Sequence, residues 1–458
     1  MEITINGNTK IEIIMTYIYK MKKLIKDPIH GTIEIDEYLL KFIDTPQFQR
    51  LRNLYQLGDL YWVFPGATHR RFEHCIGASY LSEQLCSILQ NNQPSLKITN
   101  HDKILIGLAG LCYNLGHGPF GRAWSDKLVP LFNPYTKKSW DHEDMSSSML
   151  NYLITENDIA ISDDDLNFVQ SVINPKFYIK PPKYLNKLFL YDIISNHRNG
   201  IDVDKVDNVI RDCYYIGMKS SFNDGNLIKL CRVVNNEICF PQKKIYQIYE
   251  LFRMQYKLFT EVYSYKTASA IDYMICDVLY NANNVYHFSD IIQNNDPEAF
   301  MKLTDNILYE IECSKNPLLK ISQDIIQRIH NRDLYKYVGQ CLISSINNNV
   351  HTTMYQLNQF TAENIAHYCT GNIIPDDLIV EKVKINYDIK DDTDPMLNTK
   401  FFPTRNINIV QTPNAISFCD ILPTNFEKVY MRVFVKNSNK LLDALRGYEL
   451  FLKKNGLR

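Results

Sequence analysis

The spacing of apolar residues between Thr45 and about residue 290 limits the possible fold more than any other feature of this 458-residue sequence. In stretches such as 76–89, 104–114 and 185–194, apolar residues recur with the period of an α-helix that buries one face. The stretch that begins near Gln49 stops at Gly58, a residue type that commonly ends helices. Because 45% of the residues are hydrophobic, a sizeable core is available. We therefore expect one mainly α-helical core.

The apolar pattern changes toward the C-terminus. Residues 299–347 continue the helical pattern, whereas from Leu378 onward apolar and polar residues alternate as they do in half-buried strands. We expect strands at 380–385, 407–410 and 429–435, followed by a helix at 440–452. Residues 391–395 hold three aspartates and no apolar residue before a proline, which predicts an exposed loop. The C-terminal part is thus predicted to be a smaller α+β lobe.

The first residues show the alternating pattern of β-strands instead of the helical spacing. Residues 2–13 alternate apolar and polar types around Asn6-Gly7, a dipeptide suited to the tight turn of a β-hairpin. The predicted organisation therefore has three parts: an N-terminal hairpin arm at 1–22, a helical core at 23–290, and a helical extension with the α+β lobe at 291–458.

Charge and cysteine content narrow the classes of partner. The formal net charge of −1 gives no overall electrostatic reason to expect nucleic acid or a membrane as partner. The eleven cysteines include no C-x-x-C pair, so reduced thiols in an intracellular, cytoplasmic or nuclear protein are expected. No run approaches the roughly 20 apolar residues of a membrane span, and no secretory leader is recognisable.

The sequence contains the frame of a divalent-metal site of the His-Asp (HD) type. Such a site combines an upstream histidine, an adjacent His-Asp pair on a helix and a distant aspartate, and it leaves coordination positions open for phosphate and water. Here His74 and Asp204 stand at the outer positions, but Tyr113 and Asn114 stand where the central pair belongs. The frame is present and its central pair is replaced.

Five ordered stretches extend this frame into a family resemblance. They are DPIHGTIEI (27–35), TPQFQRLRNLYQLG (45–58), FPGATHRRFEHCIG (64–77), LGHGPF (115–120) and NGIDVDKVD (199–207). Together they resemble the HD-domain deoxynucleoside triphosphate (dNTP) triphosphohydrolase family that includes the animal enzyme with a sterile alpha motif. The resemblance implies a helical fold, a homo-oligomer (dimer or tetramer), a divalent metal (Fe, Mn, Mg or Zn), and cleavage of a dNTP to a deoxynucleoside and triphosphate.

The resemblance also implies roles for individual residues. His74 and Asp204 match metal ligands, with Asn114 at the position of a third. His117, His142 and Asp204 match catalytic residues beside the phosphates. The residues that match the sugar, α-phosphate and pocket contacts are Gln56, Leu57, Arg71, Lys205, Asp212 and Tyr263. A regulatory guanine-nucleotide site of the family is matched by Lys23, Asp44, Gln49 and Arg52.

The sequence departs from the family pattern at the positions that would bind the metal and donate the proton. The phenol of Tyr113, with a reference pKa near 10, stays protonated at neutral pH, and the amide of Asn114 has no formal charge. Arg122 stands where a histidine would protonate the leaving oxygen, and a guanidinium cannot act as that acid. The metal is therefore predicted to be weakly held or absent.

Other positions of the family sites also differ. Asn208 replaces a tyrosine, and one helix carries Arg253, Gln255 and Phe259 in place of histidine, arginine and histidine. At a second, dNTP-type effector site the matching residues are Asn226, Pro241 and Tyr265, all replaced, and Lys266, which is kept. Altered regulation is the interpretation that these differences favour.

Three functions remain open at this point. The first is a catalytically eroded member that still binds a dNTP or a GTP-like nucleotide. The second is a working phosphohydrolase that uses an oxygen of Asn114 together with His117, His142 and Asp204. The third is a scaffold for nucleic acid or protein. For single residues the alternatives are structural: His74 as a core histidine, Asp204 as a helix cap, and Lys23, Asp44, Gln49 and Arg52 as a charged surface.

Overall fold

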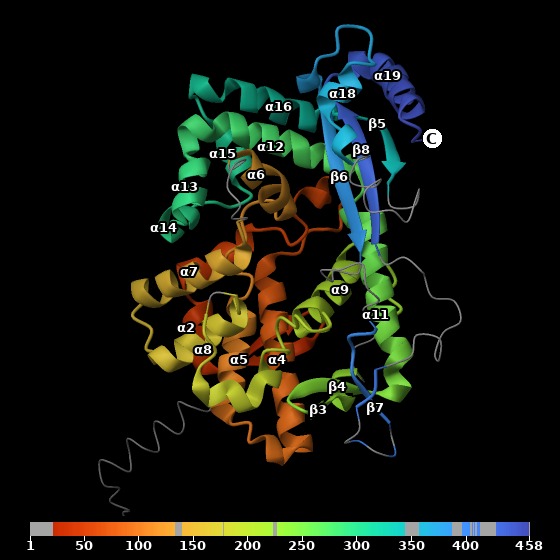
Figure 1. Cartoon of the computed structure of the whole chain (residues 1–458). Coiled ribbons are helices and arrows are strands. Elements are labelled where there is room, and N and C mark those ends of the chain that lie inside the picture. The colour runs from red at the N-terminus through yellow and green to blue at the C-terminus, as the bar shows by residue number, and fades with distance from the viewer. Residues whose placement is uncertain are drawn as a thin grey trace, which may run out of the picture.

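The computed structural model describes most of the chain (Figure 1). The described residues are 22–132, 140–176, 178–222, 227–343, 357–386, 396–403, 405, 407, 410–412 and 427–457. The predicted hairpin at 2–13, the predicted loop at 391–395 and residues 408 and 409 of the predicted strand at 407–410 lie outside them, as does Asn226.

Helices form most of the described structure, as the apolar spacing predicts. The α-helices are α2 (Glu37–Ile43), α3 (Pro46–Gln49), α4 (Arg71–Asn92), α5 (Asn100–Cys112), α6 (Val129–Phe132), α7 (His142–Glu156), α8 (Asp163–Ile173), α9 (Val203–Tyr215), α10 (Leu227–Leu230), α11 (Ile245–Leu258), α12 (Lys266–Tyr286), α13 (Phe288–Asn294), α14 (Pro297–Phe300), α15 (Ile307–Cys313), α16 (Lys320–His330), α18 (Ala362–Ala366) and α19 (Leu441–Lys454). Among the described residues, no helix combines the length and apolar character needed to cross a membrane.

Shorter helical turns connect these elements. The 3₁₀ turns are η1 (Arg50–Asn53), η2 (Gly58–Trp62), η3 (Pro94–Leu96), η5 (Pro182–Leu190), η7 (Gln242–Lys244), η9 (Pro317–Leu319), η10 (Pro375–Asp377) and η12 (Ser438–Lys440), and two π-helical turns are η4 (Ala123–Leu128) and η8 (Phe259–Tyr263). Gly58 adopts a positive φ of 56°, which suits its predicted role as a helix stop. A Cβ at Gly58 would also lie 2.6 Å from the carbonyl oxygen of Phe120.

The helices α4 and α5 pack along each other at the centre of the helical body; α4 carries His74 of the HD frame, and Asn114 follows just after the end of α5. Glycines on α5 permit the close approach, because a Cβ at Gly110 would lie 2.7 Å from Ser82 Oγ of α4. The helix α9 crosses α4 where a Cβ at Gly77 would meet Asp207 Oδ1 at 2.2 Å. These contacts bring His74, Asn114 and Asp204 from three separate segments to one place.

Three small sheets complete the structure. The strands are β1 (Lys23–Asp27), β2 (Gly31–Ile35), β3 (Arg232–Val234), β4 (Glu237–Pro241), β5 (Lys336–Leu342), β6 (Leu378–Asn386), β7 (Phe401–Phe402) and β8 (Glu427–Val435). The sheets are β1-β2, β3-β4-β7 and β5-β8-β6, with β8 antiparallel to both of its neighbours. In Figure 1 the β5-β8-β6 sheet stands beside α18 and α19, which forms the predicted α+β lobe.

Two hydrophobic cores match this arrangement. The main core runs from Ile33 to Tyr335 and also takes in Met396, Phe401 and Phe434. The second core lies between the β5-β8-β6 sheet, α18 and α19. A mainly α-helical core with a small α+β lobe is therefore confirmed, while the boundaries at residues 22 and 290 stay predictions.

Some elements differ from the sequence-based prediction. The helix expected at 185–194 is instead the 3₁₀ segment η5, which follows Pro181 and Pro182 and is kinked at Lys187. Residues 336–342, expected to be helical, form β5, because pairing with β8 buries Val338 and Cys341 in the second core. Two hairpins, β1-β2 and β3-β4, were not predicted; the second turns through Asn235 and Asn236, both at positive φ.

Candidate functional site

One large cavity, of about 920 Å³, collects the predicted pocket residues. Its walls come from α7, α9, the end of α11, η8, α12, and the segments that precede α4, follow α5 and precede α9. The predicted residues that line it are Gln56, Leu57, Arg71, Asn114, His117, His142, Asp204, Lys205, Asp212 and Tyr263. The structure thus brings ten residues from distant parts of the sequence into one cavity, although their roles stay predictions.

The position of the HD frame is filled by a hydrogen-bonded group of three side chains. His74 Nε2 lies 3.0 Å from Asp204 Oδ1. The amide nitrogen of Asn114 lies 3.0 Å from His74 Nε2 and donates to Asp204 Oδ1 at 2.8 Å. His74 is fully buried, and Asp204 is partly open to the cavity. His74 and Asp204, the two outer residues of the HD frame, therefore contact each other and the Asn114 amide directly.

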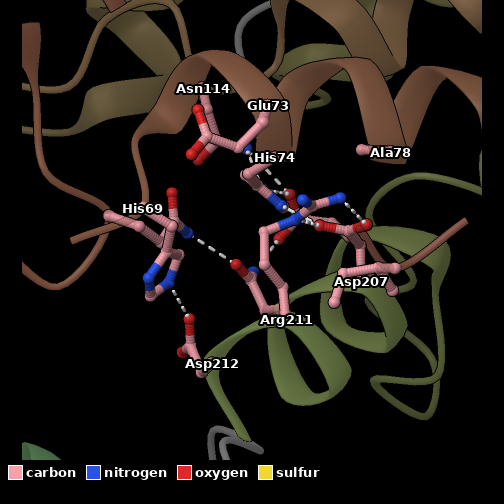
Figure 2. Close-up of polar contacts among 12 residues, drawn as sticks. His69, Glu73, His74, Ala78, Asn114, Asp207, Arg211 and Asp212 are labelled. Atoms are coloured by element: carbon pink, nitrogen blue, oxygen red, sulfur yellow. Dashed lines mark hydrogen bonds and ion pairs between the residues drawn. The ribbon is translucent and has the colours of Figure 1, made fainter. Parts of the chain in front are cut away.

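A buried aspartate on α9 orients His74. Asp207 Oδ2 lies 2.7 Å from His74 Nδ1 and accepts from Arg211 Nε at 2.8 Å (Figure 2). Its other oxygen lies 2.6 Å from His30 Nε2. Burial would raise the pKa of Asp207, but the Arg211 guanidinium and the hydrogen bonds from both histidines hold it well below its usual range. The Nε2 of His74 is thereby turned toward Asp204 and Asn114.

The sequence of α9 explains why these groups meet. Asp202 caps the helix, accepting from the backbone N–H of Lys205 at 2.9 Å. Asp204, Asp207 and Arg211 follow at positions that share one helix face, and this face lies against α4. Burial alone would lower the pKa of His74, but Asp204 and Asp207 raise it to about 9.

Tyr113 takes part in a different network. Its hydroxyl donates to Glu143 Oε1 at 3.1 Å and lies 3.3 Å from Ser195 Oγ, and its ring packs edge-on against His142. Burial, together with the negative charge of Glu143, raises the pKa of Tyr113 well above its ordinary value. The Tyr113 side chain is therefore a neutral phenol whose hydrogen bonds go to Glu143 and Ser195 and not to His74. This arrangement is structural and does not suit a metal ligand.

His117 and His142 stack on each other in the cavity. Their ring centroids are 4.2 Å apart and the rings are nearly parallel. Burial, reinforced by the nearby charge of Arg71, lowers the pKa of His117 well below its ordinary value, and burial likewise lowers the pKa of His142. Both imidazoles are accordingly neutral at physiological pH and able to accept a proton.

Arg71 is a buried cation that no described residue pairs with. Only 6% of the residue is exposed, and its guanidinium lines the cavity. Its Nε has no hydrogen-bond partner, and no described residue forms an ion pair with the group. Burial lowers the pKa of Arg71 to about 10, so the side chain is still charged at pH 7. An unpaired buried charge costs several kcal/mol unless an anion binds it.

Arg122 and Phe259, two departures from the family, lie together at the edge of the cavity. The guanidinium of Arg122 sits 5.1 Å from the centroid of the Phe259 ring and pairs with Asp126 at 3.2 Å. The Arg122 side chain is 57% exposed. A permanent cation therefore occupies the position of the expected proton donor.

The sugar side of the cavity is also built from linked side chains. Gln56 Nε2 donates to Asn208 Oδ1 at 2.6 Å, and Asn208 Nδ2 donates to Asp204 Oδ2 at 2.9 Å. Asp212 lies 2.7 Å from His69 Nε2 and accepts from the hydroxyl of Tyr263 (Figure 2 shows the His69 contact). Asn208 stands at a pocket position that the sequence had identified as altered, whereas His69 had not been assigned a pocket role from the sequence.

The four predicted regulatory residues lie outside the cavity, on the surface near β1 and α3. Lys23 Nζ is 3.8 Å from Asp44 Oδ1, and Arg52 Nε donates to Gln49 Oε1 at 2.6 Å. The Arg52 guanidinium covers the ring of Phe72 at 3.5 Å. They form two neighbouring pairs, and their role in nucleotide binding stays a prediction.

The predicted second effector site is spread more widely. Tyr265 packs against Phe64, Lys266 lies over the ring of Tyr337, and Pro241 pairs with Phe402 at the end of β4. No described contact joins these three into one group.

Three residues that support the site were not singled out from the sequence: Asp207, Asp305 and Arg50. The last two contact residues far away along the chain. Asp305 accepts hydrogen bonds from the backbone N–H groups of Tyr55 at 2.6 Å and of Phe120, which lines the cavity, at 2.7 Å. Burial raises its pKa to about 6. Arg50 donates to the carbonyl oxygens of three residues, Leu303, Leu115 and His117. Only Asp207 had a sequence signal, its spacing of three residues from Asp204.

Comparison with known proteins decides the family. The chain is 37% identical, over 442 residues, to a deoxynucleoside triphosphate triphosphohydrolase SAMHD1 homolog of Dictyostelium discoideum. The alignment covers 96% of this chain and 82% of that protein. The human deoxynucleoside triphosphate triphosphohydrolase SAMHD1 is 36% identical, with 93% and 72% of the two chains covered. The chain belongs to the SAMHD1 family. A putative HD domain-containing protein of Acanthamoeba polyphaga mimivirus is 32% identical over 70% of this chain, and no family model matches.

Membership of the SAMHD1 family confirms the resemblance carried by the five motifs and associates the cavity with a divalent metal in general terms. The residues present do not fit such an ion. Within the described residues, no group of three or more histidine, cysteine, aspartate or glutamate side chains is arranged to hold a metal. At the HD position, the amide nitrogen of Asn114 lies within hydrogen-bond distance of both remaining predicted ligand residues, His74 and Asp204, and Tyr113 is hydrogen-bonded elsewhere. This member of the SAMHD1 family thus keeps the pocket with an altered centre.

Proposed function

We propose that this SAMHD1-family protein binds a dNTP or a closely related nucleotide without hydrolysing it at an appreciable rate. The observation that carries the proposal is the unpaired, buried guanidinium of Arg71 in a cavity large enough for a nucleotide. A buried charge of this kind lowers the stability of the folded protein, and a bound phosphate offsets that loss by pairing with the charge.

The loss of hydrolysis is supported by three replacements. A phenol at Tyr113 and an amide at Asn114 do not hold a dication as an imidazole and a carboxylate do. Arg122 does not supply the proton that the leaving oxygen needs, a contribution of about 10²- to 10⁴-fold in rate. These defects are independent, so correcting one leaves the other.

A second candidate function is slow phosphohydrolysis. It is favoured by the neutral His117–His142 stack, which lines the same cavity as Asp204 and is able to accept a proton from water. This candidate requires product to form, which separates it from the first.

The guanine-nucleotide site predicted at Lys23, Asp44, Gln49 and Arg52 belongs to the proposal as its regulatory part. Lys23 and Asp44 are both more than half exposed, so an amide edge and a phosphate are able to reach them. We expect this surface to act in a homo-oligomer, as in the family.

Two measurements on the purified protein test the proposal. Calorimetric titration with each dNTP is expected to show binding, and an assay for released triphosphate with Mn²⁺ or Fe²⁺ is expected to show none above background. Release at rates like those of active relatives would overturn the proposal in favour of an enzyme. Slow but measurable release that His117→Ala abolishes would support the second candidate.

Stepwise reversion shows how much of the site is intact. Tyr113→His with Asn114→Asp restores both missing ligands, so we expect metal binding and slow triphosphate release. Adding Arg122→His restores the acid and is expected to raise that rate by about 10²-fold or more. If the triple variant binds metal and stays inactive, the damage extends to the phosphate contacts.

A further inference from the structure

Both oxygens of Asp204 are occupied by amide groups. Asn114 Nδ2 donates to Oδ1 at 2.8 Å, and Asn208 Nδ2 donates to Oδ2 at 2.9 Å. Both asparagines stand at positions where the family pattern has another residue, and each lines the cavity. Two separate substitutions therefore converge on the same carboxylate.

The direction in which each amide faces is fixed by its neighbours. In both contacts the side-chain nitrogen of the asparagine, and not its oxygen, faces an oxygen of the Asp204 carboxyl group. A carboxylate only accepts hydrogen bonds, so Asn114 and Asn208 must present nitrogen to it; the reverse orientation would place oxygen against oxygen. Asn208 Oδ1 is then left to accept from Gln56 Nε2.

The lone pair of His74 is equally unavailable to a metal. When His74 is neutral, its Nδ1–H donates to Asp207 and its Nε2 accepts from Asn114. When it is protonated, Nε2 carries a hydrogen that faces Asp204 at 3.0 Å. In both states the nitrogen that would bind a cation is already used.

We propose that Asn114 and Asn208 replace the metal as the groups that hold His74 and Asp204 together, so that the pocket takes its nucleotide without a divalent cation. This inference rests on the proposed nucleotide binding. The charge of the phosphates is then balanced by side chains of the protein, foremost Arg71, whose Nε is a buried donor without a partner in the described chain.

The same network prepares the pocket for a hydroxyl-bearing ligand. Because Gln56 Nε2 is committed to Asn208, Gln56 Oε1 remains as a buried acceptor with no partner among the described residues. The cavity lining thus includes an acceptor, Gln56 Oε1, and a donor, Arg71 Nε, that have no partner among the described residues. A nucleotide supplies both a sugar hydroxyl and a phosphate oxygen.

Thermal unfolding of the whole native protein tests the metal part without any nucleotide. We expect the same Tm in EDTA and in excess Mn²⁺, because the amides leave no site for the ion to stabilise. Asn114→Asp places a second carboxylate against Asp204, so we expect a lower Tm in EDTA that Mn²⁺ restores. Asn174→Asp is the matched control, since Asn174 is a buried amide that donates to Asp144, and neither residue lines the cavity; its Tm should fall and not recover.

Calorimetric titration with a dNTP, in EDTA and again in Mn²⁺, tests the nucleotide part. We expect native affinities that agree within about tenfold, a difference no larger than ~1.4 kcal/mol. Tighter binding than that in Mn²⁺, or a native Tm that Mn²⁺ raises as it does for Asn114→Asp, would overturn the inference. If no nucleotide binds in either condition and Mn²⁺ does not change the native Tm, the proposed nucleotide binding is wrong. The inference that the amides replace the metal would still stand.

Discussion

At the scale of single residues, Arg71 and Arg50 show how the same side chain serves two purposes. Both are almost fully buried, and they lie near each other beside the cavity. Arg50 is satisfied by carbonyl oxygens, whereas Arg71 is not satisfied by any described residue. The first arginine therefore holds structure together, and the second is available to a ligand.

Replacing each arginine with methionine separates these purposes. Arg71→Met removes an unpaired buried charge, so we expect the ligand-free protein to gain about 1–2 kcal/mol in unfolding free energy. Its affinity for a dNTP should fall by about tenfold or more. Arg50→Met leaves several buried carbonyl oxygens without donors and is expected to cost about 3 kcal/mol. Urea unfolding and calorimetry measure both; a destabilised Arg71→Met would show that the guanidinium is structural.

At the scale of elements, α4 and α5 approach so closely that a carboxyl group is trapped between them. Glu83 of α4 faces Gly107 of α5, where a Cβ would lie 2.8 Å from Glu83 Oε1. That oxygen is buried and has no hydrogen-bond partner within the described residues. Burial raises the pKa of Glu83 to about 7. The helix pair thus carries a group that prefers to be protonated.

This group predicts a pH-dependent stability. The folded pKa is higher than the unfolded one, so the folded state binds the proton more tightly and loses stability as pH rises through about 7. Glu83→Gln removes the penalty. We expect the variant to exceed the native protein by on the order of 2 kcal/mol at about pH 8, and to differ little at about pH 5. Unfolding curves at the two pH values provide the measurement, and an equal difference at both would contradict the assignment.

Sequence periodicity predicted the elements whose buried faces are continuous. The helices at α4, α5 and α19 and the strands β6 and β8 follow directly from it. It failed at η5, where consecutive prolines change the local helix type, and at β5, whose apolar residues become strand positions only because β8 lies beside them. Short strands of this kind are decided by partners far away in the sequence.

The residues of the candidate site could be predicted where they belong to a recognisable sequence motif. His74, Asp204 and the replacements Tyr113 and Asn114 were visible as positions in a known pattern. Asp305 and Arg50 were not, because their contacts reach main-chain atoms of residues 65 to 253 positions away, which leave no side-chain pattern in the sequence. The pairing of Asn208 with Asp204 became clear only from the geometry.

At the scale of the whole molecule, a buried charge network ties the small sheet lobe to the helical body. Lys127 of η4 reaches Asp272 of α12 at 2.6 Å and Glu381 of β6 at 3.0 Å. Glu381 also accepts from Arg432 of β8 at 3.3 Å. Since Asp272 lines the cavity, the lobe is connected to the pocket wall through these charges.

Removing Lys127 should therefore loosen the lobe. Lys127→Met leaves Asp272 and Glu381 buried without their shared cation, and we expect a loss of about 3–5 kcal/mol in unfolding free energy. Lys320→Met is the matched control, because Lys320 pairs with Asp324 on the exposed surface of α16; its effect should stay below about 0.5 kcal/mol. Urea denaturation followed by fluorescence compares the two, and equal effects would show that the network does not join the lobes.

The most direct test of the central claim is a crystal structure of the native protein grown with a dNTP and Mn²⁺, with anomalous diffraction recorded to locate manganese. We predict an intact nucleotide in the cavity with a phosphate on Arg71, and no manganese peak between His74, Asn114 and Asp204. A fully occupied manganese at that position, or deoxynucleoside and triphosphate in place of the intact nucleotide, would contradict the account.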